Sequence, residues 1–405
     1  MTKERDFLGF KASGAFGVLL ALFWTFTTIP FYLRGIIVTV LGNSVIDYVI
    51  PAFFIFATII SFSTIIKATR IWDYVFMLAL VIFFLGCYVW YPKNKVYLME
   101  YETQFLFWSL PFFLLGVATN FQKCQRMLYV LSVLSIFLQL LSLFSSGVNV
   151  NDSGELEDIG RAFGIVPSVL FMIWKAIEDK SSLSICMAVL GVLEVVFMGT
   201  RGPLVAVTLF LVIFLLFFCK FKHPARSRTI IIILSFLGFL IIDNSIEIIM
   251  NLSSNLGFST RALEAFAGSK NISELIVESS GRDIIYENLI DAIRDAPFWG
   301  YGPAADRIYS DFYEVYAHNI ILEMFIEYGV VPGSMILLSI LALIIIAIRN
   351  CKDHDTIIFL LIFVFSGFVG LFANGVYWTS RNFFFLIGLC VSVIRNSKRQ
   401  LSLTT

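Results

Sequence analysis

The sequence has few charged residues. Only 14% of its 405 residues are Asp, Glu, Lys or Arg, whereas a soluble globular domain has about 25%. Hydrophobic residues make up 59% of the chain and the mean hydropathy is +0.87. This composition excludes a soluble enzyme. Acidic and basic residues balance at 29 each, so net charge does not indicate a nucleic-acid partner.

Histidine and cysteine are also scarce. The chain has three histidines and six cysteines, and no two cysteines form a CxxC pair. None of the cysteines falls in an outer loop of the topology derived below, so no disulfide framework is expected. A zinc site needs clustered His or Cys ligands, and we therefore expect neither a metal site nor a cofactor.

Long apolar runs account for most of the sequence. A bilayer span takes about 20 apolar residues, which gives this chain room for about 12 helices. We expect an all-α polytopic membrane protein that forms a single membrane-embedded domain over residues 1–405. The expected helices lie near residues 12–33, 48–66, 72–91, 104–120, 127–147, 161–177, 182–199, 203–219, 229–243, 330–348, 356–375 and 381–394.

The basic residues predict the orientation. Lys and Arg favour cytoplasmic loops, and most of those in this chain fall on one side if the N-terminus lies in the cytoplasm, beginning with Lys3, Arg5 and Lys11. Most acidic residues fall in the loops on the other side. Both termini are therefore expected in the cytoplasm.

One loop is much longer than the others. Residues 244–328 lie between the ninth and tenth expected helices on the outer side, and loops of this length are usually functional or disordered. Disorder is disfavoured because segment 281–295 repeats apolar residues at helical spacing and is followed by Pro297. These apolar residues are Ile284, Ile285, Leu289, Ile290 and Ile293. We expect a large extracytoplasmic loop with amphipathic helices that lie on the outer surface of the bundle or membrane.

Several arginines are expected on the outer side, against the general bias of basic residues. Arg161, Arg201 and Arg381 are each predicted at the outer start of a helix, where the partial positive charge of the helix N-terminus disfavours a cation. A Gly-Pro pair after Arg201 suits the first turn of a helix, and Ser380 is a candidate cap beside Arg381. Free backbone N–H groups, a helix dipole and a guanidinium together favour an anion site.

Two interpretations of these arginines stay open. Each guanidinium either reaches a lipid phosphate or an outer acid, or several of them bind one polyanion, to which the planar fork of Arg is suited. Because they oppose both the basic-residue bias and the helix dipole, we favour a shared ligand such as a pyrophosphate. Glu194 lies about two helical turns before Arg201 on the same face, so it is expected to pair with that arginine and orient it.

His318 is the one histidine expected on the outer side. Asn319 suits a helix N-cap and Gly329 a helix stop, which predicts a short helix between them with Glu323 and Glu327 on one face. An imidazole can take a proton from a hydroxyl near neutral pH without a metal. The alternative is an interfacial histidine that bonds only to loop backbone.

Three short motifs occur in order along the chain: Thr200-Arg201-Gly202-Pro203, then Gly281-Arg282-Asp283, then His318-Asn319 with Leu322-Glu323. With the flanking segments 158–164 and 378–381, they resemble the O-antigen polymerase and ligase superfamily of bacterial envelope glycosyltransferases. The resemblance covers about residues 160–390. The first five expected helices match only as generic membrane helices.

The resemblance implies a metal-independent glycosyltransferase in the bacterial cytoplasmic (inner) membrane. Such an enzyme transfers glycan from an undecaprenyl-pyrophosphate carrier to an acceptor hydroxyl at the outer leaflet, and one direct displacement inverts the anomeric carbon. The family's pyrophosphate-binding arginines correspond to Arg201 and Arg282, and its histidine to His318, which would take the acceptor proton. Residues expected to support the site are Arg161, Arg381, Glu194, Asn319 and Glu323.

The motifs leave the acceptor open. We favour a polymerase, which passes the growing chain to a lipid-linked repeat unit, because a poorly matching N-terminal half is expected of an enzyme adapted to one sugar. The alternative is a ligase that passes the chain to lipid A core. A flippase or other transporter is a second alternative, but it predicts matched broken helices in two halves. Expected partners are undecaprenyl-pyrophosphate-linked oligosaccharides, membrane lipids and a chain-length regulator, with no nucleic acid.

Overall fold

The computed structural model describes residues 65–145, 155–197, 201–219, 282–310, 316–373 and 375–404. Every regular element in these ranges is helical. Helices long and apolar enough to cross a membrane are Ile71–Trp90, Cys124–Leu141, Val330–Asn350 and His354–Phe372. By the length and composition of its helices, the chain is a helical membrane protein.

The total number of spans and their orientation stay predictions. The first and ninth expected helices lie outside the described residues, as does the second apart from its last two residues, which are helical. The other expected helices coincide with observed helices, including two shorter apolar ones at Ser182–Val196 and Gly202–Phe218.

The chain divides into two compact units. The first comprises Met1–Phe62 and Asn120–Asn271, and the second comprises Ser63–Thr119 and Ile272–Thr405. The expectation of a single membrane-embedded domain over the whole chain stays a prediction.

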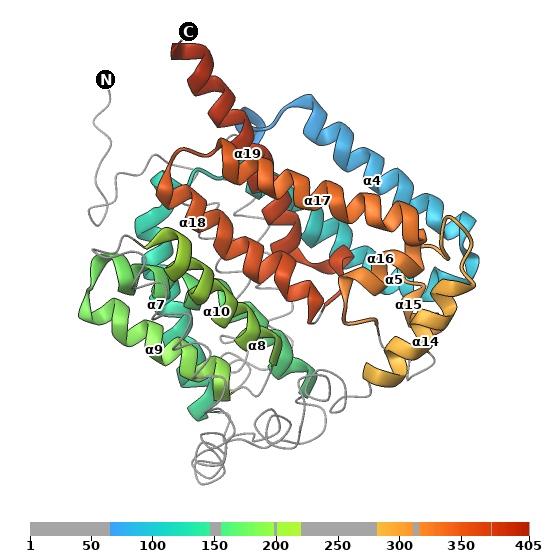
Figure 1. Ribbon diagram of the computed structural model, residues 1–405, viewed down its shortest axis with the longest axis horizontal. Helices are drawn as coiled ribbons and strands as arrows, with labels where there is room; N and C mark the ends of the chain where they lie inside the picture. Colours follow the sequence, from blue (N-terminus) through green and yellow to red (C-terminus); the bar gives the residue numbers. More distant parts are fainter. Residues whose placement is uncertain are drawn as a thin grey trace, which may run out of the picture. The chain divides into compact units, whose positions relative to one another are not determined.

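The described part of the first unit is built around one buried helix. Its helices are α7 (Phe121–Ser145), α8 (Glu155–Asp179), α9 (Ser182–Phe197), α10 (Arg201–Ile213) and the π-helical η3 (Phe214–Phe218). Helix α8 packs against α7, α9 and α10 (Figure 1), and its residues 165–175 are buried throughout. Gly191 of α9 lies against Val169 of α8, where a side chain would crowd the valine. Glycine therefore lets α9 approach α8 closely.

The second unit contains the remaining described helices and the carboxyl-terminal part of the chain. They are α4 (Ile71–Trp90), η1 (Pro92–Asn94), α5 (Lys95–Gln104), η2 (Phe105–Ser109), α6 (Leu110–Ala118), α14 (Arg282–Arg294), α15 (Asp306–Tyr309), α16 (Ile320–Tyr328), α17 (Val330–Asn350), α18 (His354–Phe363), η4 (Val364–Phe368), η5 (Val369–Phe372), η6 (Tyr377–Thr379) and α19 (Arg381–Thr404). Helices α14, α15 and α16 contact one another and gather at one end of this unit (Figure 1).

Helices α6 and α19 form the tightest packing in the second unit. Gly116 of α6 lies against the backbone of Phe385, and Gly388 of α19 lies against the backbone of Phe113. A Cβ at either glycine would collide with a carbonyl oxygen of the other helix. The two glycines thus allow backbone-to-backbone contact, as small residues do in membrane helix pairs.

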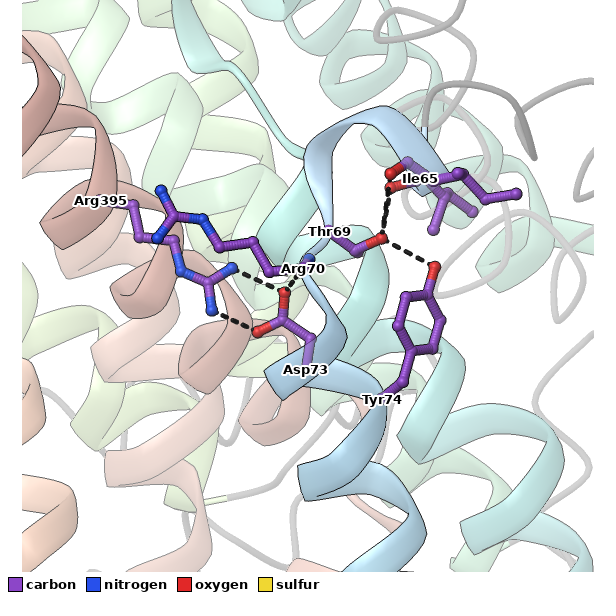
Figure 2. Close-up of polar contacts among 7 residues, drawn as sticks. Ile65, Thr69, Arg70, Asp73, Tyr74 and Arg395 are labelled. Atoms are coloured by element: carbon purple, nitrogen blue, oxygen red, sulfur yellow. Dashed lines mark hydrogen bonds and ion pairs between the residues drawn. The ribbon is translucent and has the colours of Figure 1, made fainter.

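A bidentate ion pair joins α4 to α19. Asp73, which is 3% exposed, accepts hydrogen bonds from both terminal nitrogens of the Arg395 guanidinium and from the backbone N–H of Arg70 (Figure 2). The hydroxyl of Thr69 forms a separate local contact with the hydroxyl of Tyr74 at 2.7 Å. The first turn of α4 is therefore fixed to the carboxyl-terminal helix.

Two expected helix boundaries differ from the structure. The helix expected over 104–120 belongs to a helical run that begins at Lys95, because α5 is polar on much of its surface and gives no apolar run. Arg161 was expected at a helix start, but α8 begins at Glu155 and places Arg161 more than one turn inside. The acidic residues of that first turn suit a helix N-terminus, which explains the earlier start.

Candidate functional site

The short helix predicted after His318 is present with both predicted ends. Helix α16 begins at Ile320, and the side chain of Asn319 accepts a hydrogen bond from the backbone N–H of Ile321 at 2.9 Å. Gly329 ends the helix with a φ of 80° and α17 starts at the next residue, Val330. Both caps are therefore confirmed, and the N-cap fixes the start of α16 two residues after His318.

The loop 297–302 holds the other end of α16. The N–H groups of Tyr301 and Gly302 donate to the carbonyl oxygens of Ile326 and Glu327 at 2.9 and 2.8 Å. These bonds satisfy carbonyl groups that a helix end leaves without partners. Gly300 has a φ of 70° and lies against the backbone of Glu327, so only glycine fits the turn without strain.

Helix α14 confirms the helix predicted over 281–295, and Arg282 is its first residue. Ile285 and Leu289 are buried in a cluster with Ala305, Ala317 and Ile326. The side-chain amide of Asn288 donates to the carbonyl oxygen of Ser310 at 2.8 Å.

The apolar face predicted for this helix is only partly buried. Ile284 and Ile290 are 45% and 42% exposed, although the spacing placed them with the buried residues. The protein covers a narrow stripe of α14, centred on Ile285 and Leu289, and residues at the edges of the stripe stay exposed.

The backbone at His318 is held in an uncommon conformation. His318 has a φ of 51°, which for a non-glycine residue costs about 1 to 3 kcal/mol and persists only where neighbours fix it. Before it, the N–H of Ala317 donates to the fully buried carboxylate of Asp306 at 2.8 Å. After it, Asn319 is fixed as the cap of α16. The chain thus determines the direction in which the imidazole leaves the backbone.

Tyr316 interacts with His318 and Arg282, two predicted site residues of the second unit. Its ring lies 4.1 Å from the imidazole ring of His318, centroid to centroid. Burial raises the pKa of the Tyr316 phenol, while a backbone hydrogen bond from Gly375 and the positive charges of Arg282 and Arg307 act in the opposite direction. Arg282 and His318, which are 36 residues apart in sequence, therefore act on the same side chain.

Arg307 is the second cation beside Tyr316. Its guanidinium donates to the Tyr101 hydroxyl and to the Glu100 carboxylate, both at 3.0 Å. It also lies over the rings of Tyr97, Tyr101 and Tyr316 at 5.3 to 5.8 Å. These contacts hold Arg307 against α5.

Three carboxyl groups are buried on α15 and on α16, the helix that follows His318. Burial raises the pKa of Glu323 and Glu327 on α16 and of Asp306 on α15. The negative charges of Glu327 and Asp306 raise the pKa of Glu323 further, and the charge of Asp306 raises that of Glu327. A raised carboxyl pKa favours the neutral form.

The two glutamates hold the segment that leads into α19. The hydroxyl of Tyr377 donates to Glu327 at 2.5 Å and contacts the hydroxyl of Tyr328, and the backbone of Tyr377 hydrogen-bonds to Glu323. The second oxygen of Glu327 accepts from the N–H of Ala304 at 2.6 Å. Helix α16 is therefore fixed to the turn that precedes Arg381.

Arg381 begins α19, as predicted. The Ser380 hydroxyl accepts from the N–H of Phe383 at 3.4 Å, which confirms the predicted cap, and the guanidinium of Arg381 lies 5.5 Å from the ring of Trp108. This contact shows where the guanidinium packs. It does not distinguish binding to a lipid phosphate or an outer acid from binding to a shared polyanion.

The other predicted residues belong to the first unit. Arg201 begins α10, as expected, but its side chain and that of Arg161 lie outside the described residues. Glu194 of α9 is 1% exposed, and within the described part of the chain neither of its carboxylate oxygens has a hydrogen-bond partner. The predicted pairing of Glu194 with Arg201 stays a prediction.

Sequence reasoning missed Tyr316 and Asp306. Tyr316 lies two residues before His318, close enough to be noticed, but no pattern shows which ring contacts the imidazole. Asp306 sits in a short helix, and only the folded chain brings its carboxylate to Ala317.

Residues 186–337 match a model of the O-antigen ligase family. The match contains Arg201, Arg282 and His318. It supports a place in the O-antigen polymerase and ligase superfamily, and it associates the chain with polysaccharide biosynthesis at a membrane. It does not distinguish polymerase from ligase. No curated protein and no solved structure matches the chain.

Proposed function

We propose that this protein is a polysaccharide polymerase, for O-antigen or capsule, in the bacterial inner membrane. It transfers a growing glycan from undecaprenyl pyrophosphate to a lipid-linked repeat unit at the outer leaflet. The observation that supports this best is that the ring of Tyr316 contacts the imidazole of His318 and lies within reach of the positive charge of Arg282, the first residue of α14. A group that binds an anion and a group that takes a proton are what this transfer needs.

The proposed reaction is one displacement at the anomeric carbon of the donor. The acceptor hydroxyl oxygen forms the new glycosidic bond, the bond to the pyrophosphate oxygen breaks, and undecaprenyl pyrophosphate leaves with the bonding electron pair. The guanidinium of Arg282 and the free N–H groups of the first turn of α14 stabilise the charge on that oxygen. The imidazole of His318 takes the acceptor proton. This route inverts the anomeric carbon and uses no metal.

Arg201 is the second arginine assigned to the pyrophosphate. It begins α10 as Arg282 begins α14, so each residue lies at a helix N-terminus, whose free backbone N–H groups favour an anion. In this proposal Asn319 and Glu323 support His318 through α16, and Glu194, Arg161 and Arg381 support the arginine sites.

A ligase is the second candidate, and the family match favours it as much as the polymerase. The two enzymes share one reaction and differ only in the acceptor. A transporter is the third, and the charged cluster at one end of the second unit disfavours it, because transporters place ionisable residues near the membrane midplane. A chain-length regulator and membrane lipids are the partners that a polymerase requires.

Purified enzyme and lipid-linked repeat units test the proposal. His318→Ala should abolish transfer and leave donor binding largely intact, because the base acts on the acceptor. His354→Ala, at the start of α18, is the matched control and should transfer normally. If His318→Ala transfers at the wild-type rate, His318 is not the base.

The arginine assignment has its own matched pair on one helix. Arg282→Lys should lose most activity although it keeps the charge, because an ammonium does not reproduce the bidentate fork. Arg294→Lys should keep activity, since Arg294 is exposed at the other end of α14 and, within the described residues, forms its ion pair with Asp291. Full activity of Arg282→Lys would indicate that this arginine contacts no pyrophosphate.

A further inference from the structure

Three large aromatic side chains at one end of the second unit are exposed. Trp90, Phe298 and Trp299 are 62%, 58% and 68% exposed, and the rings of Phe298 and Trp299 contact each other edge to face at 4.8 Å. Two of them lie in the loop 297–302, between the helices of the site. We call these three residues the aromatic surface.

The aromatic surface lies where two candidate membrane spans end. Helix α4 ends at Trp90 and α17 begins at Val330, and both are long and apolar enough to cross a membrane. The loop contacts both ends. The side-chain amide of Asn94 donates to the carbonyl oxygens of Tyr301 and Pro303 at 2.9 and 2.8 Å, and Gly329 lies against the carbonyl oxygen of Phe298.

Exposed apolar residues continue from this surface along α17. Val330 and Val331 are 49% and 54% exposed, and Met335 and Leu338 are 64% and 63% exposed. A face of this kind on a spanning helix contacts hydrocarbon chains. The aromatic surface therefore lies at the end of a lipid-facing stripe.

The neighbouring end of α14 is polar. Arg294 and Asp291 are 73% and 64% exposed at their side chains and form an ion pair at 2.8 Å, and Asp295 follows them at the surface. The chain thus passes from exposed charges to exposed aromatic rings within a few residues. Tryptophan is enriched where a membrane meets water, because its ring is apolar and its N–H is polar.

We propose that the loop 297–302 inserts Phe298 and Trp299 into the headgroup region of the bilayer, at the level of Trp90. Its partner is the phospholipid surface. The lipid-facing stripe of α17 leads directly into the loop, which favours lipid over a second protein as the occupant.

This insertion has a consequence for the site. The same loop donates hydrogen bonds to the carbonyl oxygens of Ile326 and Glu327, so it holds the helix that begins beside His318. The inserted loop then sets the depth of His318 relative to the bilayer. This depth is that of the headgroup region, where the pyrophosphate of a lipid-linked donor lies. The insertion itself does not depend on the proposed function.

Tryptophan fluorescence in vesicles tests the insertion. The full chain is placed in phosphatidylcholine vesicles that contain a phosphatidylcholine brominated at acyl carbons 6 and 7, and the emission of Trp299 is the difference between wild type and Trp299→Phe. We expect the bromolipid to remove most of this difference signal and aqueous iodide to remove little of it. Trp299→Phe should fold, since the side chain is exposed.

A tryptophan placed on the polar end of α14 is the control. Arg294→Trp in the Trp299→Phe background should show the reverse pattern, with strong quenching by iodide and weak quenching by bromolipid. Quenching of Trp299 by iodide alone would place the loop in water and overturn the proposal. Resistance to both quenchers would also overturn it, because the surface would then be covered by protein. Neither readout requires activity, so this outcome is separate from that of the transfer assay.

Discussion

At the scale of single residues, the structure fixes His318 from three directions. Asp306 holds the backbone before it, Asn319 caps the helix after it, and the ring of Tyr316 lies against its imidazole. A base that must meet one acceptor hydroxyl gains rate from such fixed geometry. Holding the imidazole in this direction requires a left-handed φ at His318, which costs conformational free energy.

The ring of Tyr316 should matter more than its hydroxyl for transfer. Tyr316→Leu removes the ring contact with His318, and we expect kcat to fall about 10- to 100-fold, with little change in KM for the donor. Tyr316→Phe keeps the ring and should stay within a few-fold of wild type. Steady-state kinetics with lipid-linked donor measures both. If Tyr316→Phe instead raises the donor KM as strongly as Arg282→Lys, the phenol binds the donor and does not position the imidazole.

Local sequence signals predicted some of these residues and long-range contacts determined the others. Asn319, Gly329 and Ser380 could be predicted because capping depends on a few neighbouring residues. The contacts of Arg307 with Glu100 and Tyr101 join residues more than 200 positions apart, and no periodicity shows such a pairing. The family resemblance gave Arg282 and His318 their roles but named no partner for either.

At the scale of helices, the buried glutamates of α16 make the second unit sensitive to pH. Burial and the charge of Glu327 raise the pKa of Glu323 well above its usual value of 4.5. Below pH 4.5 this group is protonated in both the folded and the unfolded chain, and its stabilising contribution is fully present. As the pH rises above that value towards the folded pKa, the unfolded chain loses the proton first and the contribution is lost.

Replacing Glu323 by Gln should therefore flatten the decline of stability with rising pH. Thermal unfolding in detergent at pH 5 and pH 8 measures the slope, and Glu323→Gln should lose less stability between the two than wild type does. Glu287→Gln, at an exposed position on α14, should keep the wild-type slope. Equal slopes for wild type and Glu323→Gln would show that Glu323 titrates alike in both states.

The ion pair between α4 and α19 should contribute to the stability of the second unit. Asp73→Ala leaves Arg395 without its carboxylate, and loss of one partner from a largely buried pair costs roughly 3 kcal/mol. Thr69→Val removes the local contacts of its hydroxyl with Tyr74 and with the carbonyl oxygen of Ile65, and should cost about 1 kcal/mol or less. Denaturant unfolding of both variants in detergent compares them. Equal stabilities would mean that solvent replaces the carboxylate at Arg395.

Helices were predictable where apolar runs or caps mark them. Helix α17 has an apolar run and a glycine before it, and its predicted start coincides with the observed one at Val330. Helix α5 has neither, and its start at Lys95 was missed. The apolar face of α14 was overestimated because spacing shows which residues share a side of a helix and not how much of that side the protein covers.

At the scale of the whole molecule, the three residues assigned to the reaction are distributed over both units. Arg282 and His318 lie in the second unit, whereas Arg201 begins a helix of the first. The family match spans both. Binding of one pyrophosphate by both Arg201 and Arg282 therefore stays part of the proposal.

Gene deletion distinguishes the two acceptors, because cells that lack a polymerase and cells that lack a ligase accumulate different products. Without a polymerase, flipping and attachment still operate, so single repeat units should cap the usual anchor of the surface polysaccharide. Without a ligase, the anchor should stay bare while carrier-linked polymer accumulates. We predict the first pattern for deletion of this gene, observed on a gel of surface polysaccharide, and the same pattern for His318→Ala at normal protein level. A bare anchor with long polymer on undecaprenyl pyrophosphate would identify a ligase, and the proposed roles of Arg201, Arg282 and His318 would stand unchanged, because both enzymes break the same bond.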